Sequence, residues 1–244
     1  MCKVKKFFLK RLPVHLTLID PEKCNTEEKI IKAIKQLKQI KTDAILVGGS
    51  SNLGVHTITN TFKKLKETLK IPLLSFLRDA SGVNPLADAA FAPMVLNSRK
   101  KWFLSDNFLN CIDNVLENNI ELLTLAYLVQ PGDTSVSFIV DPHRIYSKES
   151  VLRMYARFIN RAGFDFAYLE GGSGSKKTIS PGVVSGLKKY LTVPLLVGGG
   201  IKNPDDADKF LKAGVDGLVT GSLFEKEKIE VIKKIVSKVT TYRK

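Results

Sequence analysis

Short apolar runs alternate with longer amphipathic stretches along nearly the whole chain, and this alternation constrains the fold more than any other feature. Runs that are short, rich in β-branched residues and flanked by breakers are typical of strands. Strands that alternate with helices form parallel sheets. The runs predict strands over 14–19, 43–47, 71–76, 89–96, 121–129, 164–169, 193–197 and 215–219.

The stretches between these runs predict helices. In 26–41, Ile and Leu recur at helical spacing with Lys on the outer face, and Thr26 followed by Glu27 and Glu28 forms an N-terminal cap and first turn. Similar patterns predict helices over 55–70, 104–119, 148–162, 180–190, 203–213 and 223–241.

Eight strand–helix units in 244 residues favour an α/β fold with a closed sheet, a single (β/α)8 TIM-type barrel, because such barrels take about 250 residues. No linker or change of composition divides the chain, so we expect one domain over 1–244. Segment 77–88 is rich in Ser, Gly, Asn and Pro and predicts a loop or short turn in place of the third helix. Segment 130–143 begins with a Pro-Gly turn and predicts a short hairpin-like insertion.

The amino-acid composition limits the kinds of partner that the protein can bind. Thirty-eight Lys and Arg against 24 Asp and Glu give a net charge of +14, which predicts an anionic partner or surface. Most Lys lie on predicted helix exteriors and no RNA-binding motif occurs, so we expect no nucleic-acid partner. The three Cys and three His show no zinc-like spacing. Without a secretory signal in 1–10 or a membrane-spanning run, we expect a cytoplasmic protein with at most peripheral contact to an anionic membrane.

Glycines follow the last two predicted strands, where the active sites of βα barrels lie. Gly199 and Gly200 follow the seventh strand, and Gly221 and Ser222 follow the eighth. Glycine lets the backbone approach an anion closely, and the next helix start adds outward N–H groups. This pair of loops predicts a phosphate site; the alternative is that the glycines only permit turns.

The sixth predicted strand ends in Tyr168, Leu169 and Glu170, before the loop residues Gly171, Gly172, Ser173 and Gly174. Alternate strand residues share a face, so Tyr168 and Glu170 point into the barrel mouth while Leu169 packs outward. A carboxylate beside a phosphate site can deprotonate a substrate hydroxyl. The alternative is a surface ion pair.

The first two strands suggest a metal site. The first ends in Asp20, which Pro21 follows, and the second leads to Ser50 at the same end of the barrel. A carboxylate, a hydroxyl and substrate phosphates suit Mg²⁺, which takes few protein ligands. Alternatively, Asp20 caps the first helix.

The chain resembles the geranylgeranylglyceryl phosphate synthase family, including its bacterial heptaprenyl relatives. The motifs that carry this resemblance run in order through most of the chain: HLTLIDPEK at 15–23, ILVGGSSNLG at 45–54, ADAAFAPMVLNS at 87–98, AYLVQPGDTSV at 126–136, YLEGGSGS at 168–175, LLVGGGIKNPDDA at 195–207 and VDGLVTGS at 215–222.

The resemblance implies a Mg²⁺-dependent prenyltransferase that joins a polyprenyl diphosphate to the 3-hydroxyl of sn-glycerol 1-phosphate in archaeal-type lipid biosynthesis. It implies that Glu170 accepts the hydroxyl proton, that Asp20 and Ser50 bind Mg²⁺, and that the protein is a dimer or hexamer. Glycerol 1-phosphate would be held by Tyr168, Leu169, Glu170, Gly171, Gly172, Ser173, Gly174, Gly199, Gly200, Gly221 and Ser222.

The chain departs from the family's usual pattern at three places. Phe76-Leu77-Arg78 replaces Phe-Pro-Gly after the third strand, and Gly221-Ser222 replaces Gly-Asn after the eighth. After Asn97-Ser98, RKKWFLSDNF replaces the Asn-Pro and Gly-Gln pattern typical of the prenyl side. We expect the prenyl groove near 77–88 with Phe91, Met94 and Val95. Two alternatives stay open: a phosphosugar isomerase or lyase that shares only the phosphate site, and a non-catalytic basic barrel.

Overall fold

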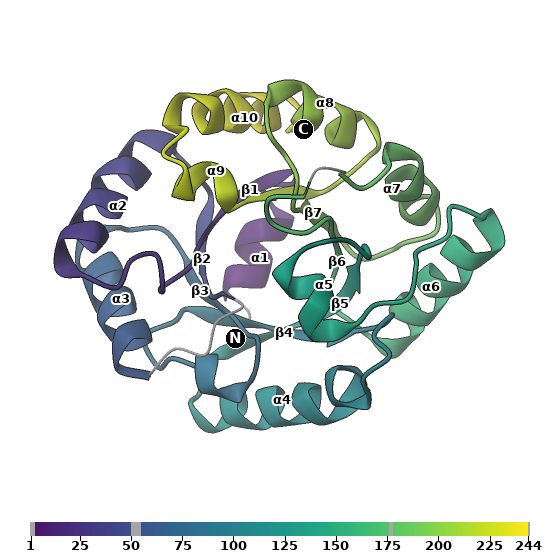
Figure 1. The fold of residues 1–244 in the computed structure, drawn as a ribbon, viewed down its shortest axis with the longest axis horizontal. Helices are drawn as coiled ribbons and strands as arrows, with labels where there is room; N and C mark the ends of the chain where they lie inside the picture. The colour runs from purple at the N-terminus through teal and green to yellow at the C-terminus, as the bar shows by residue number, and fades with distance from the viewer. Residues whose placement is uncertain (1–2, 50–54, 176–177, 244) are drawn as a thin grey trace.

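The sheet of this computed structural model closes on itself (Figure 1). The structure describes residues 3–49, 55–175 and 178–243. Its parallel strands pair in chain order, and the last pairs with the first, which confirms the predicted TIM-type barrel. The strands are β1 (Val14–Ile19), β2 (Ala44–Val47), β3 (Leu73–Phe76), β4 (Ala89–Val95), β5 (Glu121–Val129), β6 (Phe166–Glu170), β7 (Leu195–Gly198) and β8 (Gly217–Thr220).

Helices surround the barrel in the order that the amphipathic pattern predicts. Thr26 caps the first of them, and its hydroxyl accepts the Lys29 N–H at 3.4 Å. A single 3₁₀ turn, η1 (Ala80–Gly82), lies between β3 and β4, which confirms the loop predicted there. The outer helices are α2 (Glu27–Ile40), α3 (Val55–Thr68), α4 (Asn107–Glu117), α6 (Glu149–Ala162), α7 (Pro181–Lys188), α8 (Pro204–Lys212) and α10 (Ile229–Thr241).

The hairpin predicted in 130–143 is wrong, because residues Ser135–Val140 form a short helix, α5, over the barrel mouth (Figure 1). Thr134 caps it by accepting the Ser137 N–H at 3.4 Å. Val136, Ile139 and Val140 are spaced i, i+3 and i+4, so a helix gathers them on one face.

Three further elements differ from the predictions. The segment 223–241 splits into α9 (Ser222–Glu225) and α10, with Glu227 in the left-handed region at φ 56° between them. A π-helical turn, η2 (Trp102–Asp106), precedes α4. The chain begins with an additional helix, α1 (Lys3–Leu9), whose Val4 and Phe8 close the amino end of the barrel core. Among the described residues, no helix is long and apolar enough to cross a bilayer.

Strand alternation separates two apolar layers. Inside the barrel, residues such as Leu16, Phe91 and Phe166 pack with Phe8 of α1. Their neighbours along the strands face the outer helices. Leu169 lies in the outer layer and Tyr168 in the inner one, as predicted.

Four aspartates tie the amino ends of the strands together. Each directly precedes an even-numbered strand. Its carboxylate accepts a backbone N–H of the odd-numbered strand before it, at 2.7–2.9 Å. Each also pairs with a basic side chain. The four are Asp43, Asp88, Asp165 and Asp216. β3, β6, β7 and β8 each begin two residues later than predicted, and β6 and β8 begin directly after Asp165 and Asp216.

Candidate functional site

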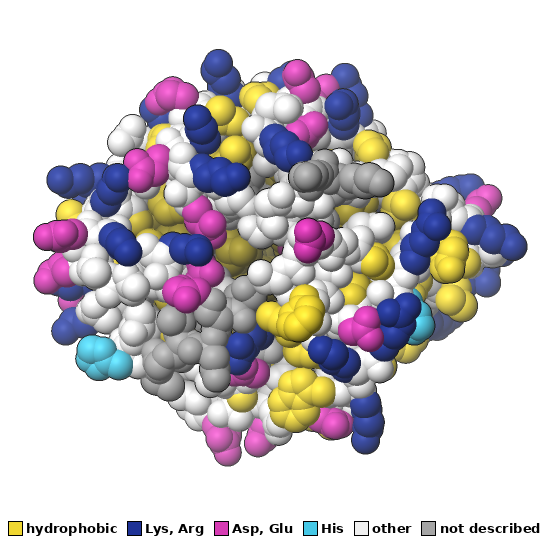
Figure 2. All heavy atoms as spheres, in the orientation of Figure 1, with side chains coloured by type: hydrophobic (Ala, Val, Ile, Leu, Met, Phe, Trp, Pro, Cys, Tyr) yellow, Lys and Arg dark blue, Asp and Glu magenta, His cyan; other side chains and the backbone are white. Residues whose placement is uncertain are grey.

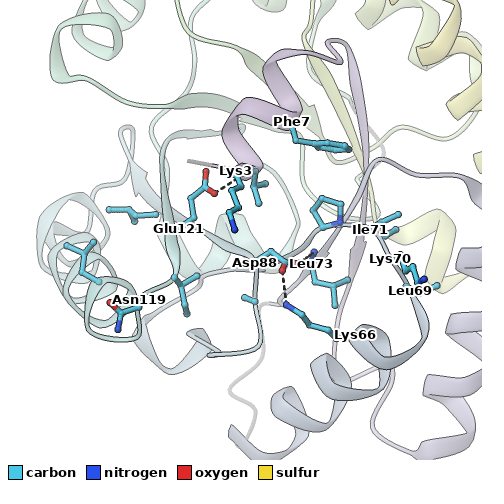
Figure 3. Close-up of a pocket in the computed structure, with 16 residues that line it drawn as sticks. Lys3, Phe7, Lys66, Leu69, Lys70, Ile71, Leu73, Asp88, Asn119 and Glu121 are labelled. Carbon is cyan, nitrogen blue, oxygen red and sulfur yellow. Dashed lines mark hydrogen bonds and ion pairs between the residues drawn. The ribbon is translucent and has the colours of Figure 1, made fainter. Parts of the chain in front are cut away.

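The two ends of the barrel differ in what they offer a ligand. A hollow of about 1160 Å³ lies beside α1 at the amino end (Figure 3). Its polar groups already stabilise the fold: Lys66 pairs with Asp88 at 2.7 Å, and Glu121 accepts the backbone N–H groups of Val4 and Lys5 at 2.8 and 2.9 Å. The glycine loops lie at the opposite end, so we assign the site to the carboxyl end.

A cavity of about 280 Å³ opens at the carboxyl end, and we call it the mouth cavity. Figure 2 shows the hollow at the centre of this face. One wall is polar and carries Asp20, Glu170 and Glu225. The other wall is apolar and is built by Val95 of β4, Phe103 of η2 and three residues of α5, Val136, Ile139 and Val140.

Glu170 lies where the polar wall meets the barrel core. Its side chain is buried, and its carboxylate accepts the Gly172 N–H at 2.5 Å and the Tyr127 hydroxyl at 3.3 Å. The Tyr168 hydroxyl also hydrogen-bonds to it. These donors fix the carboxylate at the end of β6.

Burial sets the proton affinity of this cluster. Desolvation raises the pKa of Glu170, while the hydrogen bonds from Gly172, Tyr168 and Tyr127 oppose the rise. Burial, followed by the charge of Glu170, raises the pKa of both tyrosines well above the ordinary value. A carboxylate of raised proton affinity beside two neutral phenols is suited to accept a proton.

Two glycines of β7 and the loop after it make room for these side chains. A Cβ on Gly198 would lie 1.9 Å from the Tyr168 hydroxyl, and one on Gly199 would lie 2.0 Å from Glu170 Oε1. Gly199 also has φ +75°. Other side chains at these positions would displace the carboxylate cluster.

The predicted phosphate loops converge. Ser173 Oγ and Ser222 Oγ lie 2.6 Å apart, which joins the loop after β6 to the start of α9. Gly172, Gly174 and Gly200 adopt left-handed backbone conformations near them. Gly171 donates its N–H to Gly198 O at 2.8 Å, and Gly221 lies directly before α9.

Asp20 follows β1, the strand that pairs with β8, and it lines the mouth cavity. Its Oδ1 accepts the Glu22 N–H at 3.0 Å, and burial raises its pKa. The pKa of Glu225 is raised by burial first, and the charge of Asp20 also raises it. Ser50 lies outside the described residues. Over 3–49, 55–175 and 178–243, no three His, Cys, Asp or Glu gather as a metal-binding group.

The residues predicted to form a prenyl groove only partly coincide with the lining of the mouth cavity. Leu77, Arg78 and Val95 line the mouth cavity. Phe91 does not, because it is fully buried inside the barrel, and Met94 packs against the outer layer. Sequence reasoning missed Tyr127, although an aromatic residue near the carboxyl end of a predicted strand was a usable indication. It also missed the contributions of α5 and Phe103.

Comparisons with known proteins agree with this geometry. The geranylgeranylglyceryl phosphate synthase of Nitrosopumilus maritimus is 33% identical over 240 residues, which cover 96% of each chain. That of Methanosarcina barkeri is 35% identical over 234 residues, covering 95% of this chain and 94% of its own.

Similarity extends to solved structures. The crystal structure of (S)-3-O-geranylgeranylglyceryl phosphate synthase from Thermoplasma acidophilum, in complex with its substrate sn-glycerol-1-phosphate, superposes with a TM-score of 0.90 at 28% identity and covers 99% of this chain and 100% of that one. Residues 6–239 match the sequence profile of the PcrB family. The chain therefore belongs to the PcrB family.

Proposed function

We propose that this protein is a prenyltransferase that forms an ether bond between the 3-hydroxyl of sn-glycerol 1-phosphate and a polyprenyl diphosphate, in archaeal-type lipid biosynthesis. The observation that carries the proposal is the position of Glu170, a buried carboxylate between converging glycine loops and an apolar wall. The relatives named for this activity, at 33–35% identity, support it.

Glycerol 1-phosphate binds with its phosphate between the loops after β6, β7 and β8. Glycines let the backbone of 173–174, 199–200 and 221 approach an anion closely, while the Gly171 and Gly172 N–H groups bond to Gly198 O and Glu170 Oε1. The Ser173 and Ser222 hydroxyls, which hydrogen-bond to each other at 2.6 Å, leave one O–H free to donate to the phosphate. The glycerol hydroxyl then lies beside Glu170, which the same loop positions through Gly172.

Glu170 serves as the general base. The glycerol 3-oxygen forms a bond to C1 of the prenyl chain, the bond from C1 to the diphosphate oxygen breaks, and the diphosphate leaves with the electron pair. The hydroxyl proton moves to Glu170. Burial raises the pKa of this carboxyl, which increases its affinity for that proton.

The apolar wall takes the prenyl chain. Val95, Phe103, Val136 and Ile139 give it a surface of aliphatic and aromatic carbon that excludes water from the reacting carbon. Fixing both substrates in reach lowers the entropic part of the barrier. Geranylgeranyl is the chain that the names of the relatives suggest.

The residues present fit a Mg²⁺ ion. Asp20 offers a hard oxygen donor on the polar wall, and a carboxylate whose pKa is raised by burial gains from a nearby cation. Asp20 would hold the ion together with Ser50, and Glu225 is a further carboxylate nearby. When bound, the ion neutralises charge that develops on the leaving diphosphate.

The same proposal includes a homo-oligomer, a dimer or hexamer, in the cytoplasm. Helices α4 and α6 expose Leu109, Leu116, Met154 and Phe158, each at least 50% exposed. An aromatic chain from Phe108 through Phe164 to Phe158 links the two helices. An apolar face of this kind suits a second copy of the chain, and size-exclusion chromatography of Leu109→Glu tests it.

An activity assay tests the proposed function. The protein is incubated with Mg²⁺, a series of prenyl diphosphates and either sn-glycerol 1-phosphate or its 3-phosphate enantiomer, and the product mass is measured. We expect an ether product from the 1-phosphate, and loss of product when a chelator removes the metal. Absence of product with every donor overturns the proposal, and turnover of a phosphosugar instead favours the isomerase or lyase alternative.

A further inference from the structure

We propose that an aromatic and basic surface beside the mouth cavity docks this protein onto an anionic lipid bilayer. The surface, which we call the rim, consists of Trp102, Phe138 and Tyr146 with Arg99, Lys100, Lys101 and Arg144. The docking itself follows from the surface alone. That the cavity takes its prenyl substrate from the bilayer rests on the proposed function.

Helix α5 is apolar on two sides. Val136, Ile139 and Val140 line the mouth cavity, so burial explains them. Phe138 lies on the same short helix outside that lining and is 86% exposed, the largest exposed fraction among the exposed large apolar side chains of the described residues. An exposed apolar ring beside an apolar cavity suits contact with the interior of a bilayer. The lipid would then cover both the Phe138 ring and the opening of the cavity.

Two further aromatic side chains accompany Phe138. Trp102 is 46% exposed and directly precedes Phe103, which lines the cavity. Tyr146 is 56% exposed, and the Arg144 guanidinium lies 5.5 Å from its ring centroid. Trp and Tyr concentrate where a membrane meets water, because their rings are apolar and their N–H or O–H groups remain hydrated.

The basic groups of the rim are attached to the same structure. Lys100 Nζ donates to the carbonyl oxygens of Phe138 and Ile139 at 3.4 and 2.5 Å, and Arg99 pairs with Asp141 just after α5 at 2.9 Å. The Lys101 side chain is 84% exposed. Figure 2 shows large apolar side chains next to Lys and Arg side chains over α5 and the start of α4, beside the central hollow.

The rim is both basic and apolar, and this combination favours a lipid bilayer over other anionic partners. Each Lys or Arg near an anionic membrane contributes about 1 kcal/mol of attraction. A nucleic-acid duplex would leave Phe138 in water, because phosphate contacts carry its affinity. The exposed side chains of α4 and α6, Leu109, Leu116, Met154 and Phe158, do not line the mouth cavity. Trp102 and Phe138 are the chain neighbours of Phe103 and Ile139, which line the mouth cavity, so a docked protein opens its apolar wall to the lipid.

Vesicle co-sedimentation of the full chain tests the docking. The vesicles are phosphatidylcholine alone or phosphatidylcholine mixed with phosphatidylglycerol. We expect binding to the mixed vesicles that high salt weakens, and a loss of about tenfold in the partition coefficient for Phe138→Ser. Lys101→Glu weakens it by about fivefold. The controls Ile31→Ser on α2, 43% exposed, and Lys70→Glu at the amino end of the barrel leave it unchanged.

Activity measurements separate docking from chemistry. With a long prenyl diphosphate embedded in mixed vesicles, Phe138→Ser and Trp102→Ala reduce the rate; with soluble geranyl diphosphate and no vesicles they leave it unchanged. If neither donor yields product with the unmodified chain, the proposed function fails while the sedimentation result still stands.

Three results overturn the docking proposal. One is equal binding to both kinds of vesicle or to neither. The second is an equal loss for Ile31→Ser and Phe138→Ser. The third is a change of oligomeric state in lipid-free Phe138→Ser, measured by size-exclusion chromatography with light scattering, since the rim would then contact a second copy of the chain.

Discussion

The Glu170 carboxylate is destabilised in its charged form by burial and stabilised by three hydrogen-bond donors, and this balance defines the site at the residue scale. Burial favours the protonated form of the group, and the donors favour its charged form. Together they leave the carboxyl buried and with a raised pKa.

Replacement of this group tests its role. We expect Glu170→Gln to lower kcat by about 10²–10⁴-fold with little effect on the fold, because Gln keeps the shape and loses the base. In the unmodified protein the rate falls as the pH drops through the raised pKa of Glu170. Tyr127→Phe removes a donor to the charged form, so its acidic limb shifts to higher pH. Profiles of rate against pH check the fall in rate at low pH and its shift in Tyr127→Phe. An unshifted acidic limb in this variant would argue against Glu170 as the titrating group.

The same carboxyl links stability to pH. Because its pKa is raised in the folded protein, the folded state binds the proton more tightly than the unfolded state does. The stability it contributes is complete below the pKa of the unfolded state and is lost as the pH rises through the folded-state pKa. We therefore expect the melting temperature of Glu170→Gln, relative to the unmodified protein, to increase from acid to neutral pH. A constant difference in scanning calorimetry would contradict this.

Gly199 and Gly174 form a matched pair for a second test. Both are left-handed, at φ +75° and +73°, but a Cβ at 199 would meet Glu170 Oε1 while one at 174 would meet nothing within 4 Å. Gly174→Ala should cost about 1 kcal/mol of backbone strain. Gly199→Ala should cost about 1–3 kcal/mol more and displace the base. Chemical denaturation measures the loss of unfolding free energy in both variants. Equal losses would show that the Glu170 side chain moves aside without an energetic penalty.

At the scale of elements, the short pieces added around the βα units build the apolar half of the site. The regular strands and helices follow from local periodicity, so the sequence predicts them with small errors at their ends. Periodicity does not identify helix α5, because a segment of six residues is too short to distinguish a helix from a hairpin. Tyr127 comes from β5, so the register in which β5 pairs with β6 brings it to Glu170.

Element η2 sets the size of the apolar wall. Its π-helical turn places Phe103 in the mouth cavity and Trp102 outside that lining. Phe103→Ala should enlarge the cavity and shift the preferred prenyl diphosphate to a longer chain, by about tenfold in relative kcat/KM. Trp102→Ala is the control, with soluble donors, and should leave the preference unchanged. Competition between donors, read as product masses, decides between them.

At the scale of the whole molecule, stability and chemistry occupy opposite ends of the barrel. The four aspartates join neighbouring strands at the amino end, and the glycine loops and carboxylates lie at the carboxyl end. The sequence contains the aspartates at regular places before alternate strands, yet their common role appears only when strand pairing is known. Changes at one end should therefore leave the other largely intact.

Two of these aspartates provide a graded test. The Asp43 side chain is 5% exposed and pairs with Arg243, whereas that of Asp88 is 36% exposed and pairs with Lys66. Asp43→Ala should destabilise the fold by about 3 kcal/mol and Asp88→Ala by about 1 kcal/mol. Both should retain kcat well below the melting temperature. Urea denaturation with parallel rate measurements checks this; equal losses, or a loss of kcat, would contradict it.

The contact between Gly49 and Asp20 has a consequence for how this chain can diverge. The three atoms nearest to a Cβ at position 49 would all belong to the Asp20 carboxylate, the closest being Oδ1 at 2.5 Å, so this carboxylate is the main obstacle to a side chain there. A descendant that abandoned the reaction and lost Asp20 would find position 49 open to mutation. Replacement of this glycine in a natural variant would then indicate a barrel that no longer catalyses the reaction, although the glycine itself takes no part in the chemistry.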